Sequence, residues 1–223
     1  MTQTVSDAIQ ARHASRAFLD KAVDEQQIYQ ILDLARRAPS GVNTQPWQVS
    51  VVSGHTKQTL ETQMLTQFNS GRRGKMQYQY YPKTWVPPYK QRRVETGKKL
   101  YGALNIARED KEKQRQQWAA NYRGFDAPLV LFFWMDNVLE TGSYLDYGMF
   151  LQNIMLLATE HGLATCPQGA LGEYPDIVRQ ALEVPADKIL IGGMAIGYED
   201  TSHPINQYRT EREPVENFTR FYH

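Results

Sequence analysis

Two arginines near the start of the chain, Arg12 and Arg16, are the first residues whose types point to a chemical task. Val5, Ala8 and Ile9 follow the spacing of a helix with one apolar face. Arg12 falls on the same stripe, and a guanidinium that faces a core is costly unless it meets an anion. Arg16 adds a second cation, and a phosphate group suits two such donors. The alternative is an arginine that extends its charge to solvent or pairs with a neighbouring acid.

Residues 39–47, Pro-Ser-Gly-Val-Asn-Thr-Gln-Pro-Trp, form a second group with binding chemistry. The segment joins an expected helix to an expected strand and is dense in hydrogen-bonding groups. Ser40, Asn43 and Gln45 offer donors and acceptors that match the ring edge of a flavin or nucleotide. For this segment considered alone, an ordinary capped loop is the simpler interpretation.

Cys166 begins a third segment, Cys-Pro-Gln-Gly-Ala, which follows an apolar helix. Its proline and small residues let the backbone approach a planar ligand. We do not expect Cys166 to be a nucleophile, because no histidine stands in an obvious dyad with it and buried single cysteines are usually inert.

A fourth segment, Arg209-Thr210-Glu211-Arg212, places two arginines in the C-terminal tail. The pair is able to complete an anion site. A solvated charged turn is the simpler interpretation of these residues by themselves.

The elements that must position these segments alternate between helix and strand along one domain that spans residues 1–223. Helices are predicted from apolar spacing and strands from short apolar runs bounded by turn residues. Helices are expected to begin near Val5 and Asp24 and to cover 144–161 and 175–182, and strands to cover 47–52, 128–135 and 189–198. This order favours an α+β fold with a central sheet of mixed strand direction flanked by helices.

Residues 66–122 are expected to form a long insertion over that domain. The first part, 66–94, mixes glycines and prolines with several tyrosines and a tryptophan, which is typical of an excursion rather than a core element. The second part, 95–122, is charged and weakly amphipathic, and we expect surface helices that form a movable cap.

The segment 144–161 is apolar on nearly every side, unlike the other expected helices. A helix without a polar face must be covered all round, so it lies either in the core or at a subunit interface. The tail after Asp200 carries scattered aromatics and is long enough to wrap a neighbouring subunit.

Composition excludes several classes of protein. The chain is 41% hydrophobic and 22% charged, with a net charge of +1, so no global field favours nucleic acid or a membrane. Its apolar runs are far shorter than the roughly 20 residues of a membrane span, and no signal peptide is evident. A single cysteine excludes an internal disulfide, and we expect a cytoplasmic protein. No dinucleotide fingerprint, Walker motif or metal-ligand spacing is present.

Taken together and in this order, the four segments resemble the FMN-dependent nitroreductase family. The family pattern has an arginine-rich start, then Pro-Ser-x-x-Asn-x-Gln-Pro-Trp, a buried helix that leads into a short proline-containing loop, and a basic pair near the C-terminus. The match spans almost the whole chain, and residues 39–47 are its most specific part. The resemblance implies an intertwined homodimer with two FMN sites, each built from both subunits.

The resemblance also implies a role for each matching residue. One set holds the FMN phosphate, the ribityl chain and the pyrimidine end of the ring: Arg12, His13, Ala14, Arg16, Arg209 and Arg212. A second set reaches the isoalloxazine from the partner subunit: Pro39, Ser40, Gly41 and Asn43. A third set covers the other edge of the ring, near its reactive nitrogen: Pro167, Gln168, Gly169 and Ala170.

Two departures from the family pattern stand out. Ala14 occupies the place of a common serine, with Ser15 beside it, so one side-chain bond to phosphate is lost or moved. The insertion replaces an Asn-x-x-Lys element, and Tyr89-Lys90-Gln91-Arg92 is the expected substitute, with Arg92 beside the O2 side of the flavin.

The implied activity is hydride transfer from NADH or NADPH through bound FMN to a nitroaromatic or quinone-like acceptor. The chemistry occurs at N5 of FMN, so no catalytic side chain and no metal are expected. Two alternatives stay open: a reductive dehalogenase or flavin-fragmenting member of the same superfamily, and a non-catalytic flavin binder.

Overall fold

A four-stranded sheet forms the centre of the protein in the computed structural model, which describes residues 4–72 and 74–223. Its strands are β1 (Gln48–Ser53), β2 (Leu129–Asp136), β3 (Ala164–Gln168) and β4 (Lys188–Gly197), in the order β1-β2-β4-β3. The central strand β2 is apolar at nearly every position because both of its faces are covered. Strands β1, β2 and β4 match the three predicted strands.

Strand direction differs from the prediction of a mixed sheet. All three neighbouring pairs run antiparallel. Within the described residues, the parallel contact is the isolated bridge between Ala14 and Thr165. Strand β3 itself was not predicted, because Pro167 interrupts its five-residue sequence and its burial does not alternate.

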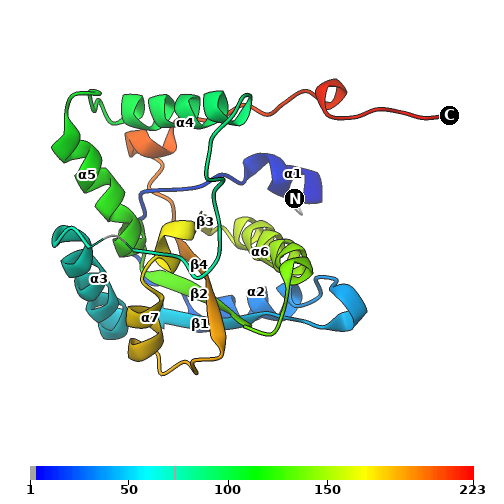
Figure 1. Cartoon of the computed structure of the whole chain (residues 1–223), viewed down its shortest axis with the longest axis horizontal. Helices are drawn as coiled ribbons and strands as arrows, with labels where there is room; N and C mark the ends of the chain where they lie inside the picture. The colour runs from blue at the N-terminus through cyan, green and yellow to red at the C-terminus, as the bar shows by residue number, and fades with distance from the viewer. Residues whose placement is uncertain (1–3, 73) are drawn as a thin grey trace.

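Helices cover both faces of the sheet (Figure 1), and alternate residues of β2 belong to two separate cores. Leu131 and Phe133 pack against α2 (Glu25–Ala35) and α6 (Thr141–Glu160). Phe132 and Trp134 pack on the opposite side, against α3 (Gly54–Asn69) and α7 (Pro175–Ala181). Helix α1 (Val5–Ala11) lies beside α6, so the two segments that carry Arg12 and Cys166 meet at one end of the sheet.

Helices α4 (Tyr89–Ala103) and α5 (Lys111–Ala119) lie outside these layers, over one end of the sheet (Figure 1). Helix α4 buries none of its residues, and α5 buries Ala119 alone. Both helices fall in the predicted insertion, but its first part differs from the expectation. Residues 66–69 belong to α3 and 89–94 to α4, so the irregular connection is confined to 70–88.

Two apolar surfaces stay uncovered in the single chain. The outer face of α6 exposes Leu145 at 74% and Met149 at 38%, although its other face is buried. Val5 and Ile9 of α1 are also exposed, so the predicted apolar stripe of α1 buries only Ala8.

The C-terminal tail extends away from the body of the protein (Figure 1). Its apolar side chains are exposed: Val215, Phe218, Phe221 and Tyr222. Among the described residues, no helix combines the length and apolarity needed to cross a membrane.

Candidate functional site

Four arginines from the two ends of the chain line one cavity of about 540 Å³. Arg12 leaves the end of α1 in an extended conformation, and Arg16 follows it. Arg209 and Arg212 enter from the tail, and His13 and Ala14 complete the wall. No carboxylate of the described residues lines this cavity. Burial together with the charge of Arg212 lowers the pKa of Arg12. The arrangement is a cluster of cations that suits an anionic ligand.

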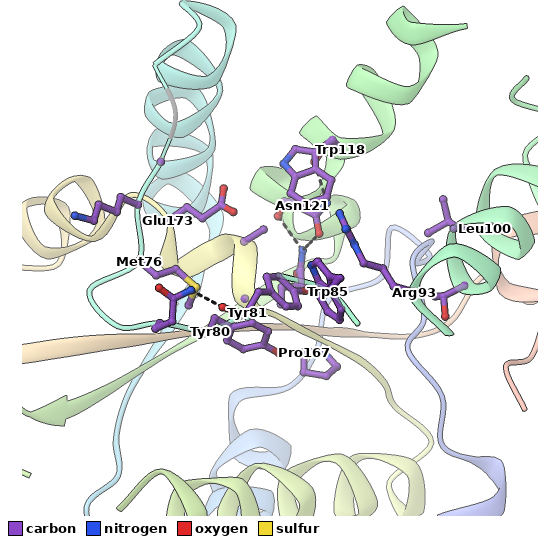
Figure 2. Close-up of a pocket in the computed structure, with 18 of the residues that line it drawn as sticks. Met76, Tyr80, Tyr81, Trp85, Arg93, Leu100, Trp118, Asn121, Pro167 and Glu173 are labelled. Carbon is purple, nitrogen blue, oxygen red and sulfur yellow. Dashed lines mark hydrogen bonds between the residues drawn. The ribbon is translucent and has the colours of Figure 1, made fainter. Parts of the chain in front are cut away.

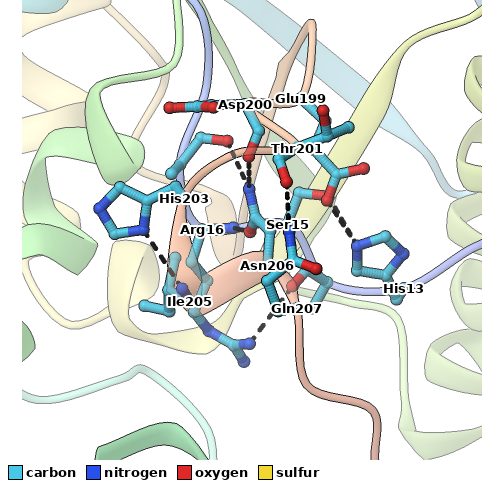
Figure 3. Close-up of polar contacts among 12 residues, drawn as sticks. His13, Ser15, Arg16, Glu199, Asp200, Thr201, His203, Ile205, Asn206 and Gln207 are labelled. Carbon is cyan, nitrogen blue, oxygen red and sulfur yellow. Dashed lines mark hydrogen bonds and ion pairs between the residues drawn. The ribbon is translucent and has the colours of Figure 1, made fainter. Parts of the chain in front are cut away.

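A polar network joins the start of the chain to the tail and positions Arg16 (Figure 3). The Arg16 amide donates to Oδ1 of Asn206 at 2.8 Å, and the Asn206 side chain donates to the Ala17 carbonyl at 2.9 Å. The Arg16 guanidinium donates to the hydroxyl of Tyr208 at 2.9 Å and contacts no acid among the described residues.

The side chains of His13 and Ser15 make hydrogen bonds within this network. His13 Nε2 lies 2.6 Å from Oε1 of Glu199, and the Ser15 hydroxyl donates to the same oxygen at 3.2 Å (Figure 3). Ser15 is fully buried. His13 lines the smaller cavity, and Ser15, beside Ala14, does not.

A larger cavity of about 1370 Å³ adjoins the first, and Arg16 lines both. Pro167, Gln168, Gly169 and Ala170 form one wall, at the end of β3 (Figure 2). Gly192 on the neighbouring strand has a φ of +147°, and a side chain there would meet the Gln168 carbonyl oxygen at 3.0 Å. A glycine in β4 thus permits this wall to pack against the sheet.

Gln168 carries an unsatisfied acceptor at this wall. Its side chain is 5% exposed, and Nε2 donates to the Asn121 carbonyl at 2.9 Å. Its Oε1 has no hydrogen-bond partner among the described residues. Since a buried polar atom normally has a partner, this oxygen points to a ligand with an N–H or O–H group.

The connection 70–88 supplies an aromatic wall that sequence analysis did not assign to the site. Tyr80, Tyr81 and Trp85 line the larger cavity, and the Tyr80 and Tyr81 rings lie 4.6 Å apart (Figure 2). The hydroxyl of Tyr78 donates to the Ile191 carbonyl at 2.7 Å, which attaches the connection to the sheet. In the sequence, the concentration of aromatic residues in 66–94 was the feature that could have indicated this wall.

Helix α4 places Arg92 and Arg93 differently. Arg92 donates to Oε2 of Glu213 at 2.5 Å and lines neither cavity. The neighbouring Arg93 lines the larger cavity and was not singled out from the sequence. Arg92 therefore holds the tail against α4, together with Lys99, which pairs with Glu211 at 3.3 Å.

The loop formed by Pro39, Ser40, Gly41 and Asn43 lines neither cavity of its own chain. The Ser40 hydroxyl accepts from the Gln45 amide at 2.9 Å, and the Gly41 amide donates to Asp146 at 3.2 Å. Val42 is fully exposed at 102% and has a φ of 46°. A β-branched residue in this region is strained, and such strain is typical of a loop held for binding.

Cys166 is an inert core residue. It is 2% exposed, and burial raises the pKa of its thiol to about 11. The thiol is therefore protonated at neutral pH, which agrees with the prediction that it is not a nucleophile.

Comparison with known proteins agrees with this geometry. The model of the nitroreductase family matches residues 9–198. The chain is 36% identical to a chloronitrobenzene nitroreductase of Comamonas testosteroni, over 98% of this chain and 97% of that protein.

Two solved structures are similar along nearly the whole chain. The FMN- and NADPH-dependent nitroreductase NfnB from Sphigopyxis sp. strain HMH superposes with a TM-score of 0.96 at 37% identity, covering 99% of each chain. The FMN-dependent NfnB from Mycobacterium smegmatis, solved in complex with NADPH, superposes with a TM-score of 0.93 at 33% identity, covering 98% of this chain and 97% of that one. The α+β fold expected from the sequence is confirmed.

Proposed function

The chain belongs to the nitroreductase family, and on that premise we propose that it is an FMN-dependent oxidoreductase that passes hydride from NADPH or NADH to nitroaromatic or quinone-like acceptors. The observation that carries this proposal is the pair of adjoining cavities with Arg16 in the wall of both. One cavity has the charge of a phosphate site, and the other has the size and aromatic lining of a site for planar groups.

The residues present fit FMN. Arg12, Arg209 and Arg212 line a cavity without a carboxylate, which suits a dianionic phosphate. Gln168 offers an unpaired acceptor to a ring N–H group in the larger cavity. Bound FMN supplies the two-electron chemistry, which the side chains of this protein cannot perform.

The protein contributes binding, orientation and charge. Arg16, held by Asn206 and Tyr208, keeps a positive charge between the two cavities and favours anionic forms of the bound group. Residues 74–81 and 83–85 line the larger cavity. We assign no side chain as a proton donor, and solvent supplies the proton.

The proposed assembly is a homodimer in which each FMN site uses both subunits. Three observations support it: the exposed apolar face of α6, the extended tail with its exposed aromatics, and the strained, exposed loop at Val42. Ser40, Gly41 and Asn43, with Pro39, would then reach the flavin of the partner subunit.

Steady-state turnover tests this function. Purified protein freed of flavin should oxidise NADPH in the presence of nitrobenzene only after FMN is added, and riboflavin should restore far less activity because it lacks the phosphate. Turnover that is independent of FMN would contradict the proposal. Flavin binding without NADPH or NADH oxidation would instead indicate a non-catalytic binder, and breakdown of FMN would indicate a flavin-fragmenting enzyme.

A further inference from the structure

We propose that the larger cavity selects aromatic acceptors that carry an anionic substituent, such as a carboxylate, and that Arg93 binds this substituent. The inference rests on the proposed function, since it names the acceptor class of the same site. Neither Arg93 nor the preference for an anionic acceptor is part of the proposed FMN contacts.

The charges that line the larger cavity are strongly unequal. Five cationic side chains line it, against one carboxylate. The cations are Arg16, Lys75, Lys83, Lys90 and Arg93. The carboxylate belongs to Glu173, whose Oε2 accepts the Tyr122 hydroxyl at 2.5 Å. Burial raises the pKa of Glu173, and the hydrogen bond from Tyr122 opposes this effect. The cavity therefore attracts an anion.

Arg93 differs from Arg92 and Lys99 of the same helix in having no acidic partner among the described residues. Arg92 pairs with Glu213 and Lys99 pairs with Glu211, and both hold the tail. Arg93 makes no ion pair and no hydrogen bond with the described residues, and it reaches into the cavity between Trp85 and Asn121 (Figure 2). Its N–H groups are free to bind a planar anion through two parallel hydrogen bonds.

The orientation of Arg93 is set by an aromatic side chain. Its guanidinium carbon lies 5.1 Å from the centre of the Trp85 ring, within range of a cation–π interaction. Tyr81 lies beside Trp85, with ring centres 5.6 Å apart. A guanidinium held next to two aromatic rings matches a ligand that joins an aromatic ring to a carboxylate.

Lysines on the same wall are less suited to this task. Lys83 and Lys90 are exposed, as Arg93 is, but among the described residues only Arg93 of these three makes a cation–π contact. A lysine binds an anion as a point charge on a flexible stem, whereas a stacked arginine loses less freedom on binding. Phosphates of the nicotinamide dinucleotide are a second source of anionic groups for these cations, and the experiment separates the two.

The test compares two acceptors that differ in charge and little in size. Steady-state kcat/KM is measured for 4-nitrobenzoate and for 4-nitrobenzamide with the FMN-loaded enzyme at saturating NADPH. We expect a preference for the carboxylate of about 10-fold, because a charge-assisted hydrogen bond contributes roughly 1.5 kcal/mol or more. Added salt should reduce the preference.

Arg93→Met removes the charge and keeps a long apolar side chain over Trp85. It should abolish the preference by lowering kcat/KM for 4-nitrobenzoate, while the value for 4-nitrobenzamide stays within about 2-fold. Arg93→Lys should restore part of the preference. Lys98→Met is the matched control, because Lys98 is an exposed cation on the same helix that lines neither cavity. It should keep the full preference.

A binding measurement without turnover supports the kinetic one. Calorimetric titration of the oxidised holoenzyme should show tighter binding of benzoate than of benzamide in the wild type and in Lys98→Met, and no difference in Arg93→Met. This readout decides the question even if the acceptors are poor substrates.

Each possible outcome of these experiments supports or contradicts a specific part of the inference. Equal kcat/KM for the two acceptors in the wild type would overturn the inference and leave the proposed function intact. A preference that survives Arg93→Met would exclude Arg93. A raised KM for NADPH in Arg93→Met, with the acceptor preference unchanged, would assign the cation to the nucleotide phosphates. Reduction of neither acceptor would contradict the proposed function, and the titration would still show whether the cavity binds a benzoate through Arg93.

Discussion

Arg12 and Arg212 line the same cavity, although they stand at opposite ends of the chain, and the charge of Arg212 lowers the pKa of Arg12. Two like charges in a partly buried site weaken the fold unless an anion lies between them. Arg212 is held in place by contacts with Thr210, including a hydrogen bond of 2.9 Å to its hydroxyl. The fold thus keeps both cations at the cavity without an acidic partner.

Arg12→Gln is expected to weaken FMN binding by about 10- to 100-fold, because a hydrogen bond to a charged group contributes about 1.5–3 kcal/mol. Binding of riboflavin should change little, since it lacks the phosphate. Fluorescence titration of the flavin-free protein measures both affinities. Arg108→Gln on the surface is the control and should bind FMN as the wild type does. Equal losses for FMN and riboflavin would contradict a phosphate contact.

Glu173→Gln is expected to raise the melting temperature near neutral pH. Burial is the largest influence on the Glu173 pKa and raises it, and the hydrogen bond from Tyr122 opposes this effect. The folded state therefore holds the proton more tightly than the unfolded state. Stability is lost as the pH rises from the unfolded pKa through the folded one.

Melting temperatures measured across a range of pH test the direction of this effect. Below pH 4.5, the ordinary pKa of a glutamate, both states are protonated, so wild type and Glu173→Gln should melt at similar temperatures. The difference should grow as the pH rises. A variant that is less stable than the wild type at neutral pH would show that the carboxylate stabilises the fold.

Cys166 is expected to be unreactive in the folded protein. Its burial and its pKa of about 11 keep it protonated and inaccessible. An aromatic disulfide reagent should label it only after unfolding, and Cys166→Ala should retain nitroreductase activity. Rapid labelling of the native protein together with loss of activity would restore the thiol as a candidate nucleophile.

Leu145→Glu is expected to dissociate the proposed homodimer. Leu145 is 74% exposed in the single chain, on a helix face whose neighbours are apolar. A buried charge at an interface is strongly unfavourable. Sedimentation should detect monomers, and these should have lost FMN, because in the proposed assembly Ser40 and Asn43 reach the flavin of the partner subunit. Val138→Glu, an exposed position in the turn before α6, is the control and should remain dimeric. A Leu145→Glu monomer that retains FMN would contradict the shared site.

Local sequence was sufficient to predict the elements whose periodicity reports burial. Strand β2 is an unbroken apolar run. The apolar spacing predicts a buried face of α2 at Ile28, Ile31, Leu32 and Ala35, and all four are buried except Leu32, which is half-buried. Asp24 caps this helix through its side chain, which accepts from the Gln26 amide. Gln27 stands at the spacing of a capping-box partner, but its side chain donates to the His161 carbonyl at 2.9 Å. Helix α3 was missed because only Leu60 and Met64 are buried in its polar sequence.

Site residues were predictable where a side chain interrupted an apolar pattern or where a segment matched the family motif. Residues that long-range contacts bring to the site were not predictable. Arg12 was noticed because a cation stood on an apolar stripe, and the structure groups it with Arg16, Arg209 and Arg212. The segment that carries the aromatic wall is attached to the sheet by the hydrogen bond from the Tyr78 hydroxyl to the Ile191 carbonyl. No local sequence pattern predicts this long-range contact. Arg92 and Arg93 are adjacent arginines, so the sequence alone does not tell which of them lines the cavity; the fold shows that it is Arg93.

The most direct test of the central claim is an anaerobic titration of the purified protein followed by its absorbance. The protein should bind one FMN per chain, lose the flavin colour on addition of NADPH or NADH, and regain it on addition of nitrobenzene, with intact FMN recovered afterwards. Protein that stays colourless when FMN is supplied would contradict the account. So would bound flavin that neither nucleotide bleaches, or reduced enzyme that no nitroaromatic reoxidises.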